Sequence, residues 1–305
     1  MHDEPWFSNE QLATILKALP DPAFILTRSG RYAAIFGGSD SRYYHDGSVL
    51  IGKWISDVLS DEKTAWFMQE IGKALESRNL HVVEYGLSGQ DVRGLPPGGP
   101  SSVIWFEGRV QALAFQVQGE DAVLWVASNI TVRNDYEVRL RIQSETDPLT
   151  GLFNRRKLME ALSDQYEMFT RYGTPMSLLM FDIDDFKRVN DEYGHLNGDR
   201  AIQVAAEVCR SEFRSTDIPA RFGGDEFVIL MPHTDLAQAV PIAGRLRLRI
   251  AEALRLTGDL GEGATISGGL SQLLPMDVSC HEVLKRADDA LYQAKRAGRN
   301  CIISQ

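Results

Sequence analysis

An apolar segment that ends in a cluster of acids constrains the fold of this chain most. Residues 177–181 form a short apolar run, and Asp182, Asp184 and Asp185 follow within four positions. Such a run is typical of a buried strand. Carboxylates this close together repel one another unless a positive charge offsets them. The sequence therefore predicts a strand end that holds a divalent cation.

A second acidic pair lies at a predicted turn. Asp225 and Glu226 follow Gly223 and Gly224 and precede an apolar run at residues 227–231. Glycines between two strand-like segments are typical of a hairpin, so the two acidic motifs are expected at adjacent strand ends. Carboxylates with room for water and phosphate oxygens suit Mg²⁺, which implies a nucleoside triphosphate substrate. Taken alone, each motif is equally compatible with a plain turn or a solvated loop.

Composition narrows the class of protein. A length of 305 residues is enough for two domains. The net charge is −10, and acidic residues exceed basic ones both before and after position 147, which disfavours nucleic-acid binding. Three widely spaced cysteines predict neither a disulfide framework nor a zinc site. No apolar run approaches the roughly 20 residues of a membrane-spanning helix and no secretory leader is visible, so a cytoplasmic protein without membrane insertion is expected.

The N-terminal part alternates strand-like and helix-like segments. Ser8 and Gln11 form a capping-box pattern that predicts a short first helix. Strands are expected at 23–26, 32–36, 81–87, 103–115 and 122–127, and a helix at 61–77. The last three strands are expected to form an antiparallel meander. The order of these elements, GKW at 52–54 and VASNIT at 126–131 resemble a PAS sensory domain, assigned here to residues 1–132.

The segment that follows predicts a connecting helix. Residues 133–146 contain neither glycine nor proline and carry alternating charge. Tyr136, Leu140 and Gln143 recur at intervals typical of coiled coils. We therefore expect a helix that pairs with its counterpart in a dimer.

A second domain is expected over residues 147–305, so the whole chain belongs to the α/β (α+β) class. Helices are expected at 155–172, 200–213 and 237–254, and strands at 176–181, near 222–231 and at 264–270. Pro241 is expected to interrupt the third helix. A capping box at Ser279 and Glu282 is expected to begin a last helix, and Gly298 to end it.

Three motifs in this second part carry a specific resemblance. Residues 223–227 read GGDEF, residues 147–156 read DPLTGLFNRR, and residues 291–300 read LYQAKRAGRN. In order and spacing they resemble the GGDEF family of diguanylate cyclases. The resemblance implies a polymerase-palm-like domain, a central β-sheet flanked by helices, that joins two GTP molecules into cyclic di-GMP and releases two pyrophosphates.

The resemblance also assigns roles to the acidic residues. Asp182, Asp225 and the carbonyl of Ile183 would hold two Mg²⁺ ions per active site, with Mn²⁺ as a substitute. Glu226 would support the metals, and Asp225 would help to deprotonate the attacking 3′-hydroxyl group. Two metals stabilise the attacking and leaving oxygens of an in-line displacement.

Further positions match substrate contacts of the family. Asn190 and Asp199 match the residues that read guanine, although Asp199 could equally be a helix N-cap. Lys187, Lys295 and Arg299 match phosphate contacts. Gly223 and Gly224 complete the expected GTP site.

A product-inhibition site is also implied. Arg214 and Asp217 form an RxxD pattern that resembles the family's inhibitory site for cyclic di-GMP, and Arg245 resembles its second arginine. Arg247 and Arg249 lie close enough in sequence to leave that choice open. A surface ion pair is the plainer alternative for the RxxD residues.

Two protomers must face each other if each holds one GTP, so a homodimer is expected. The PAS-like domain and the connecting helix would then set the placement of the catalytic domains. Small-ligand sensing and a structural dimerisation role for the PAS-like domain are equally compatible with the sequence, and the signal is not specified. Two other functions stay open: a degenerate receptor that only binds cyclic di-GMP, and a nucleotidyltransferase with a different cyclic dinucleotide product.

Overall fold

The computed structural model describes residues 6–38, 47–93, 102–257 and 264–305. Contacts divide the chain into two compact units, Met1–Val138 and Arg139–Gln305, and each is described by itself. The boundary lies inside helix α4 (Thr131–Glu145), within the segment for which the sequence predicted a connecting helix.

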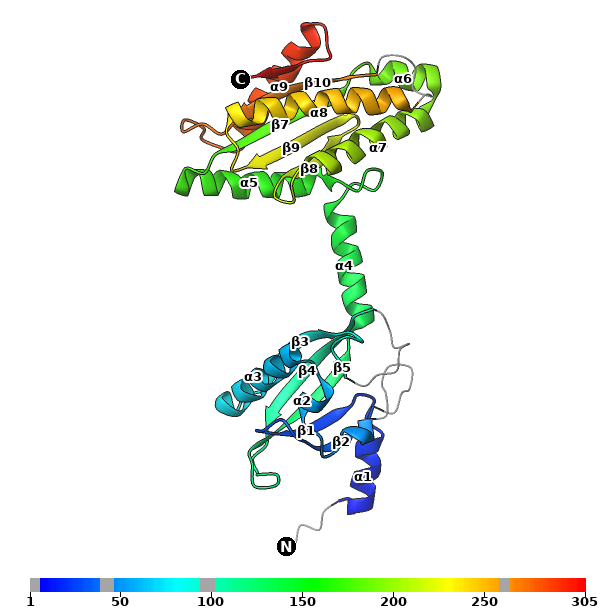
Figure 1. Cartoon of the computed structure of the whole chain (residues 1–305), viewed down its shortest axis with the longest axis vertical. Helices are drawn as coiled ribbons and strands as arrows, with labels where there is room; N and C mark the ends of the chain where they lie inside the picture. Colours follow the sequence, from blue (N-terminus) through cyan, green and yellow to red (C-terminus); the bar gives the residue numbers. More distant parts are fainter. Residues whose placement is uncertain (1–5, 39–46, 94–101, 258–263) are drawn as a thin grey trace. The chain divides into compact units, whose positions relative to one another are not determined.

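The first unit is built on a five-stranded antiparallel sheet with the order β2-β1-β5-β4-β3 (Figure 1). Its strands are β1 (Ala23–Thr27), β2 (Tyr32–Phe36), β3 (His81–Leu87), β4 (Ile104–Ala112) and β5 (Ala122–Asn129). β4 pairs with β3 on one side and with β5 on the other, both antiparallel. The predicted meander is therefore confirmed.

One face of this sheet is covered by helix α3 (Asp61–Ser77). The Ser60 hydroxyl caps its N-terminus, and its apolar side packs onto an aromatic core that includes Phe67, Tyr85 and Trp125. Three shorter elements complete the unit: α1 (Asn9–Lys17), η1 (Gly47–Leu50) and α2 (Ile55–Val58). The capping box predicted for Ser8 and Gln11 is present.

The second unit contains a six-stranded mixed sheet with the order β11-β10-β7-β9-β8-β6. The strands are β6 (Phe153–Asn154), β7 (Met176–Ile183), β8 (Ile218–Gly223), β9 (Glu226–Pro232), β10 (Ile266–Gln272) and β11 (Ile302–Ser304). β7 is buried along its whole length and pairs antiparallel with β9 and β10. This position explains why its sequence is apolar on both faces.

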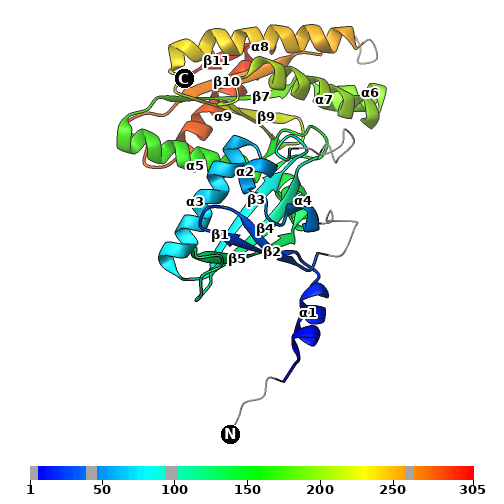
Figure 2. The same ribbon diagram turned by 60° about the horizontal axis from the view of Figure 1, so that its bottom comes forward.

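Helices cover both faces of this sheet (Figure 2). α7 (His195–Glu212) and α8 (Leu236–Leu256) pack on the face to which Leu179 and Phe181 contribute. α5 (Arg155–Tyr172) and α9 (His281–Arg296) pack on the opposite face with Leu178 and Met180. A shorter helix, α6 (Phe186–Tyr193), directly precedes α7. The expected central sheet with flanking helices is confirmed.

Four local predictions need correction. β7 continues through Asp182 and Ile183, and α7 begins five residues before position 200, after the unpredicted α6. Pro241 does not interrupt α8, because an Asp235–Gln238 capping box anchors the helix start and its apolar face stays buried across the proline. No capping box begins α9, because its N-cap is Cys280, which makes no side-chain hydrogen bond to the helix start.

The structure also bears on two expected absences. All three cysteines are free thiols. Within the described ranges, the helices are too short or too polar to cross a lipid bilayer.

Candidate active site

The two strands that carry the acidic motifs are neighbours in the sheet. Asp182 on β7 lies directly opposite Glu226 on β9. The β8–β9 hairpin has a two-residue loop, Gly224 and Asp225, closed by the pairing of Gly223 with Glu226. Gly224 has a φ of +48°, a left-handed conformation that glycine adopts at little cost. The predicted meeting of two acidic strand ends is confirmed.

Asp182 is a buried carboxylate with a cation beside it. Alternate residues of β7 face α5 and α9, and Asp182 continues the series of Leu178 and Met180 on that face. The residue is 4% exposed. Its Oδ2 pairs with Nζ of Lys295 from the last turn of α9, whereas its buried Oδ1 has no hydrogen-bond partner among the described residues. This oxygen atom is therefore free to accept a ligand.

Burial and like charge shift the pKa values of this cluster. Burial raises the pKa of Asp182 to about 6, although Lys295 opposes the shift; Asp225 and Asp184 reinforce it. The pKa of Glu226 is raised by burial and by the negative charge of Asp225. Burial disfavours the charge of Lys295, but Asp182, Asp225 and Glu226 outweigh it and raise the pKa of the ammonium group. The site therefore holds more negative charge than one lysine neutralises.

The donor set fits a divalent cation that takes few protein ligands. Within the described ranges, no three aspartate, glutamate, histidine or cysteine side chains are close enough to form a complete metal cage. Mg²⁺ needs no such cage, because water and substrate phosphates supply most of its ligands. The unpartnered Oδ1 of Asp182 and the half-buried Asp225 beside it are suitable oxygen donors. Ile183, whose carbonyl was expected as a ligand, is the last residue of β7.

The cations expected for phosphate binding lie in two places. Lys295 and Arg299 come from the end of α9, and Arg299 Nε lies 3.3 Å from Asp185 Oδ1 in the loop after β7. Lys187 is exposed on α6, which begins at the same loop. All three cations thus flank the loop that follows Asp182, although the structure shows Lys295 in direct contact with that carboxylate and not Lys187.

The expected guanine-reading residues lie on consecutive helices. A Cβ atom at Gly198 would lie 2.0 Å from Oδ1 of Asn190, so α6 and α7 approach closely at this pair. Asp199 follows Gly198 and is exposed. It lies inside α7, whose N-cap is Gly194, so the alternative reading of Asp199 as a helix N-cap is wrong.

The residues expected for product inhibition lie around the end of α7. Arg214 and Asp217 form a turn, in which each backbone N–H group donates to an oxygen of the other residue. Arg245 Nε donates to Glu212 at 2.7 Å, and Arg249 pairs with the second oxygen of the same carboxylate. Arg247 lies elsewhere, because it contacts Asn300. The structure thus brings Arg245 and Arg249, but not Arg247, to Glu212, which lies two residues before the turn.

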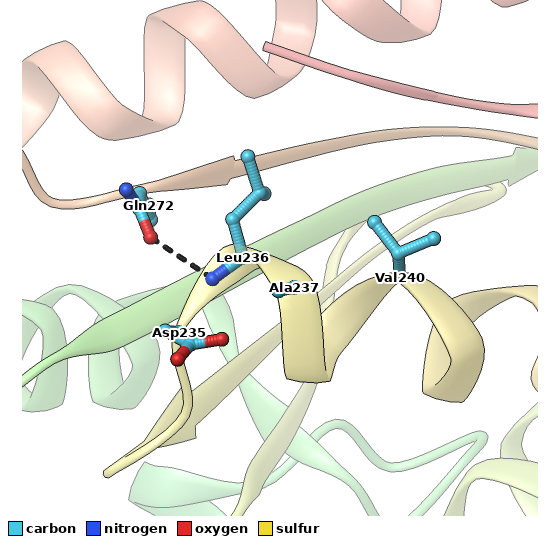
Figure 3. Close-up of a pocket in the computed structure, with 5 residues that line it drawn as sticks. All are labelled: Asp235, Leu236, Ala237, Val240 and Gln272. Atoms are coloured by element: carbon cyan, nitrogen blue, oxygen red, sulfur yellow. Dashed lines mark hydrogen bonds between the residues drawn. The ribbon is translucent and has the colours of Figure 1, made fainter.

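A surface pocket elsewhere in the unit lacks the features of a reaction centre. Asp235, Leu236, Ala237, Val240 and Gln272 line it, and Gln272 Oε1 accepts the Leu236 N–H group at 2.9 Å (Figure 3). In the β7–β10 register, Gln272 and Asp182 belong to pairs at opposite ends of the ladder. The pocket is therefore separate from the acidic cluster.

Several polar contacts support the site. An ion pair of Arg221 against the hairpin was expected from the sequence, whereas the contacts of Asp184 were not. Arg221 donates to the Gly224 carbonyl at 2.8 Å and to both Asp147 oxygens at 3.1 Å, which ties the opening motif to the hairpin. Asp184 is 6% exposed and hydrogen-bonds three groups. The sequence offered one signal for this role, since Asp184 is one of the three acids that follow the apolar run. The residues that Asp184 binds could not be inferred from the sequence.

Comparison with known proteins identifies the second unit. Residues 144–301 match the family model described as the diguanylate cyclase GGDEF domain. Response regulator PleD of Caulobacter vibrioides is 38% identical over 184 residues, which cover 57% of this chain and 38% of PleD. A diguanylate cyclase of Vibrio cholerae is 29% identical over 308 residues, or 99% of this chain and 93% of that protein.

A solved structure shares the fold. The coiled coil and GGDEF domain of DgcB from Caulobacter crescentus, in complex with c-di-GMP, superposes with a TM-score of 0.53 at 29% identity. The alignment covers 58% of this chain and 93% of that one. The family model covers more than half of the chain, and its residues include both acidic strand ends and the α9 cations. The chain therefore belongs to the GGDEF family of diguanylate cyclases.

Proposed function

We propose that the chain is a diguanylate cyclase, which condenses two GTP molecules into cyclic di-GMP and releases two pyrophosphates. The observation that carries the proposal is the buried Asp182 carboxylate, which lies opposite Glu226 and has one oxygen without a partner. Family membership supports the reaction, as do the diguanylate cyclase of Vibrio cholerae and the c-di-GMP complex of DgcB.

Asp182, Asp225 and the Ile183 carbonyl are proposed to hold two Mg²⁺ ions, or Mn²⁺ in their place. Bound metal would stabilise negative charge on the attacking 3′-oxygen and on the leaving pyrophosphate. Asp225 is proposed to accept the proton of the 3′-hydroxyl group of one GTP while the 3′-oxygen attacks the α-phosphorus of the second GTP. Glu226 adds negative charge beside the metal ligands.

The remaining substrate contacts follow from the placement of the side chains. Lys187, Lys295 and Arg299 flank the loop after β7 and are proposed to bind phosphate oxygens. Asn190 and Asp199 lie on adjacent helices where an amide and a carboxylate can address the edge of guanine. Gly223 and Gly224 are exposed in the hairpin and leave room for the nucleotide.

Regulation is proposed at two levels. The reaction needs two GTP sites facing each other, so the working form is a homodimer. The first unit is proposed to be a PAS-like domain over residues 1–132, with a helix over 133–146 that transmits its state to the catalytic domain at 147–305. The antiparallel meander supports this assignment.

Product binding at Arg214, Asp217 and Arg245 is proposed to inhibit the enzyme. The location of Arg245 on α8, next to Glu212 at the end of α7, supports its place in that site. A cytoplasmic location, where GTP is available, stays a prediction.

Substrate selectivity tests the proposal against a cyclase with another product. The full chain with Mg²⁺ is supplied with GTP alone, ATP alone or both, and the products are separated by chromatography. We expect cyclic di-GMP from GTP, no product from ATP alone and no mixed dinucleotide. A mixed or adenine cyclic dinucleotide as the main product would contradict the proposed guanine contacts of Asn190 and Asp199.

A further inference from the structure

The C-terminal turn of the second unit is held in an unfavourable backbone conformation. Arg299 and Asn300 have φ values of +65° and +46°, in a left-handed region that side chains with a Cβ atom rarely occupy. Gly298, at +111°, precedes them. Consecutive left-handed residues persist only where surrounding contacts fix them. The contacts that fix this turn therefore determine where the Arg299 side chain lies.

One set of contacts comes from the loop after β7. Asp184 Oδ2 accepts the Asn300 N–H group at 3.1 Å. Thr265 and Ser267 donate their hydroxyl groups to the same carboxylate, each at 2.6 Å, so both oxygens of Asp184 are engaged. This buried carboxylate joins the acidic loop, the start of β10 and the C-terminal turn.

A second set of contacts to the C-terminal turn comes from helix α8. Arg247 Nη1 donates to the Asn300 backbone carbonyl at 3.1 Å and to its side-chain Oδ1 at 2.6 Å. The backbone N–H, backbone carbonyl and side-chain oxygen of Asn300 are therefore all held. The Arg299 N–H group donates to the Ala294 carbonyl at 3.1 Å, which closes the end of α9.

We propose that Arg247 and Asp184 are positioning residues for triphosphate binding. Together they fix the position of Asn300 and, through it, the left-handed turn at residues 298–300. This turn directs Arg299 toward Asp185, and it ends the helix that carries Lys295. Arg247 acts from α8 and through Asn300, so it need not touch the nucleotide. The proposal rests on the proposed binding of GTP beside Asp182, and it extends that site to a residue on another helix.

The test compares the binding of two nucleotides that differ in their phosphates. Dissociation constants for GTP and GMP are measured by calorimetry, with the full chain and its Arg247→Met variant. Arg255→Ala, an exposed arginine farther along α8, is the matched control. Asp184→Asn is the second variant, and thermal unfolding confirms that each protein is folded.

We expect Arg247→Met to weaken GTP binding about tenfold, or about 1.4 kcal/mol, with GMP binding changed by less than about twofold. Arg247→Lys should weaken GTP binding less than Arg247→Met does, because lysine keeps a hydrogen-bond donor for Asn300. A general structural defect would weaken both nucleotides. GTP binding within about twofold of wild type in a folded Arg247→Met protein would overturn the proposal.

The outcome is separable from the proposed reaction. A wild-type chain that binds GTP but forms no cyclic di-GMP would contradict the cyclase function, and the comparison of GTP and GMP would still decide the role of Arg247. A wild-type chain that does not bind GTP would overturn both.

Discussion

At the scale of single residues, the proposed inhibitory site contains an acid that the sequence did not single out. The Glu212 carboxylate is 6% exposed and pairs with both Arg245 and Arg249. Its charge competes with product phosphates for the two guanidinium groups. We expect Glu212→Gln to lower the inhibition constant of cyclic di-GMP about fivefold, or about 1 kcal/mol.

Product-inhibition curves measure this effect, with Glu252→Gln as a control because Glu252 is exposed on α8. Arg214→Ala should abolish inhibition in the same assay. Unchanged or weaker inhibition in Glu212→Gln would show that the carboxylate does not compete with the product.

A buried ion pair makes the stability of the second unit depend on pH. Burial raises the pKa of Asp277, but hydrogen bonds from Arg286 and the Leu274 N–H group outweigh it, and the pKa lies below its usual value. The ionised Asp277 carboxylate therefore adds to the free energy of unfolding at pH values above its unfolded pKa of about 3.9. This stabilisation is lost as pH falls through the lower pKa of the folded protein.

Asp277→Asn should lower the free energy of unfolding by about 2 kcal/mol at pH 7, because the variant leaves the half-buried Arg286 unpaired. Urea denaturation at pH 7 and near pH 3 measures the difference, with Asp289→Asn on the exposed side of α9 as the control. A loss of equal size at both values of pH would contradict this account.

Residue chemistry determined how much of the site was predictable. Asp182 and Glu226 could be paired in advance, because apolar runs fix two strands and each run ends in an acid. The partners of Asp184, Glu212 and Arg247 could not be predicted, since they lie on elements between 33 and 116 residues away. Side-chain contacts over such separations depend on how helices pack, which periodicity does not encode.

At the scale of elements, the most specific packing joins β10 to α9. A Cβ atom at Gly269 would lie 1.9 Å from the Ala287 carbonyl oxygen and 2.4 Å from the Leu291 backbone nitrogen. Gly269→Ala should therefore destabilise the second unit by about 3 kcal/mol and displace the helix that carries Lys295. Thermal unfolding and the KM for GTP measure the two effects.

The control for this prediction is Gly244→Ala on α8. Space around that position is open, and alanine favours a helix by about 1 kcal/mol over glycine. We therefore expect equal or higher stability. A Gly269→Ala protein as stable as wild type would contradict the prediction, because β10 and α9 would then move apart with little loss of free energy of unfolding.

Elements differed in how well their sequences predicted them. α3 and α5 begin and end at the predicted residues because each has an N-cap and a left-handed C-cap. α6 was missed because it is only eight residues long and its N-cap makes no side-chain hydrogen bond, although Phe186, Val189 and Tyr193 recur at helical spacing. α8 passes through Pro241 because burial of its apolar face outweighs the lost hydrogen bond.

At the scale of the whole molecule, the two units have separate cores. A fragment of residues 139–305 should therefore fold by itself and unfold in one cooperative transition. Urea denaturation followed by circular dichroism measures this. A fragment without a cooperative transition would show that the second unit depends on the first for its stability.

The acidic cluster of the second unit is proposed to make cyclic di-GMP. The most direct measurement is the product formed from GTP and Mg²⁺ by the full chain and by its Asp225→Ala variant, resolved by chromatography. We expect cyclic di-GMP from wild type and a rate of synthesis about a thousandfold lower, or less, in the variant. Equal product from both proteins, or tight cyclic di-GMP binding without synthesis by wild type, would contradict the proposed cyclase activity of this cluster.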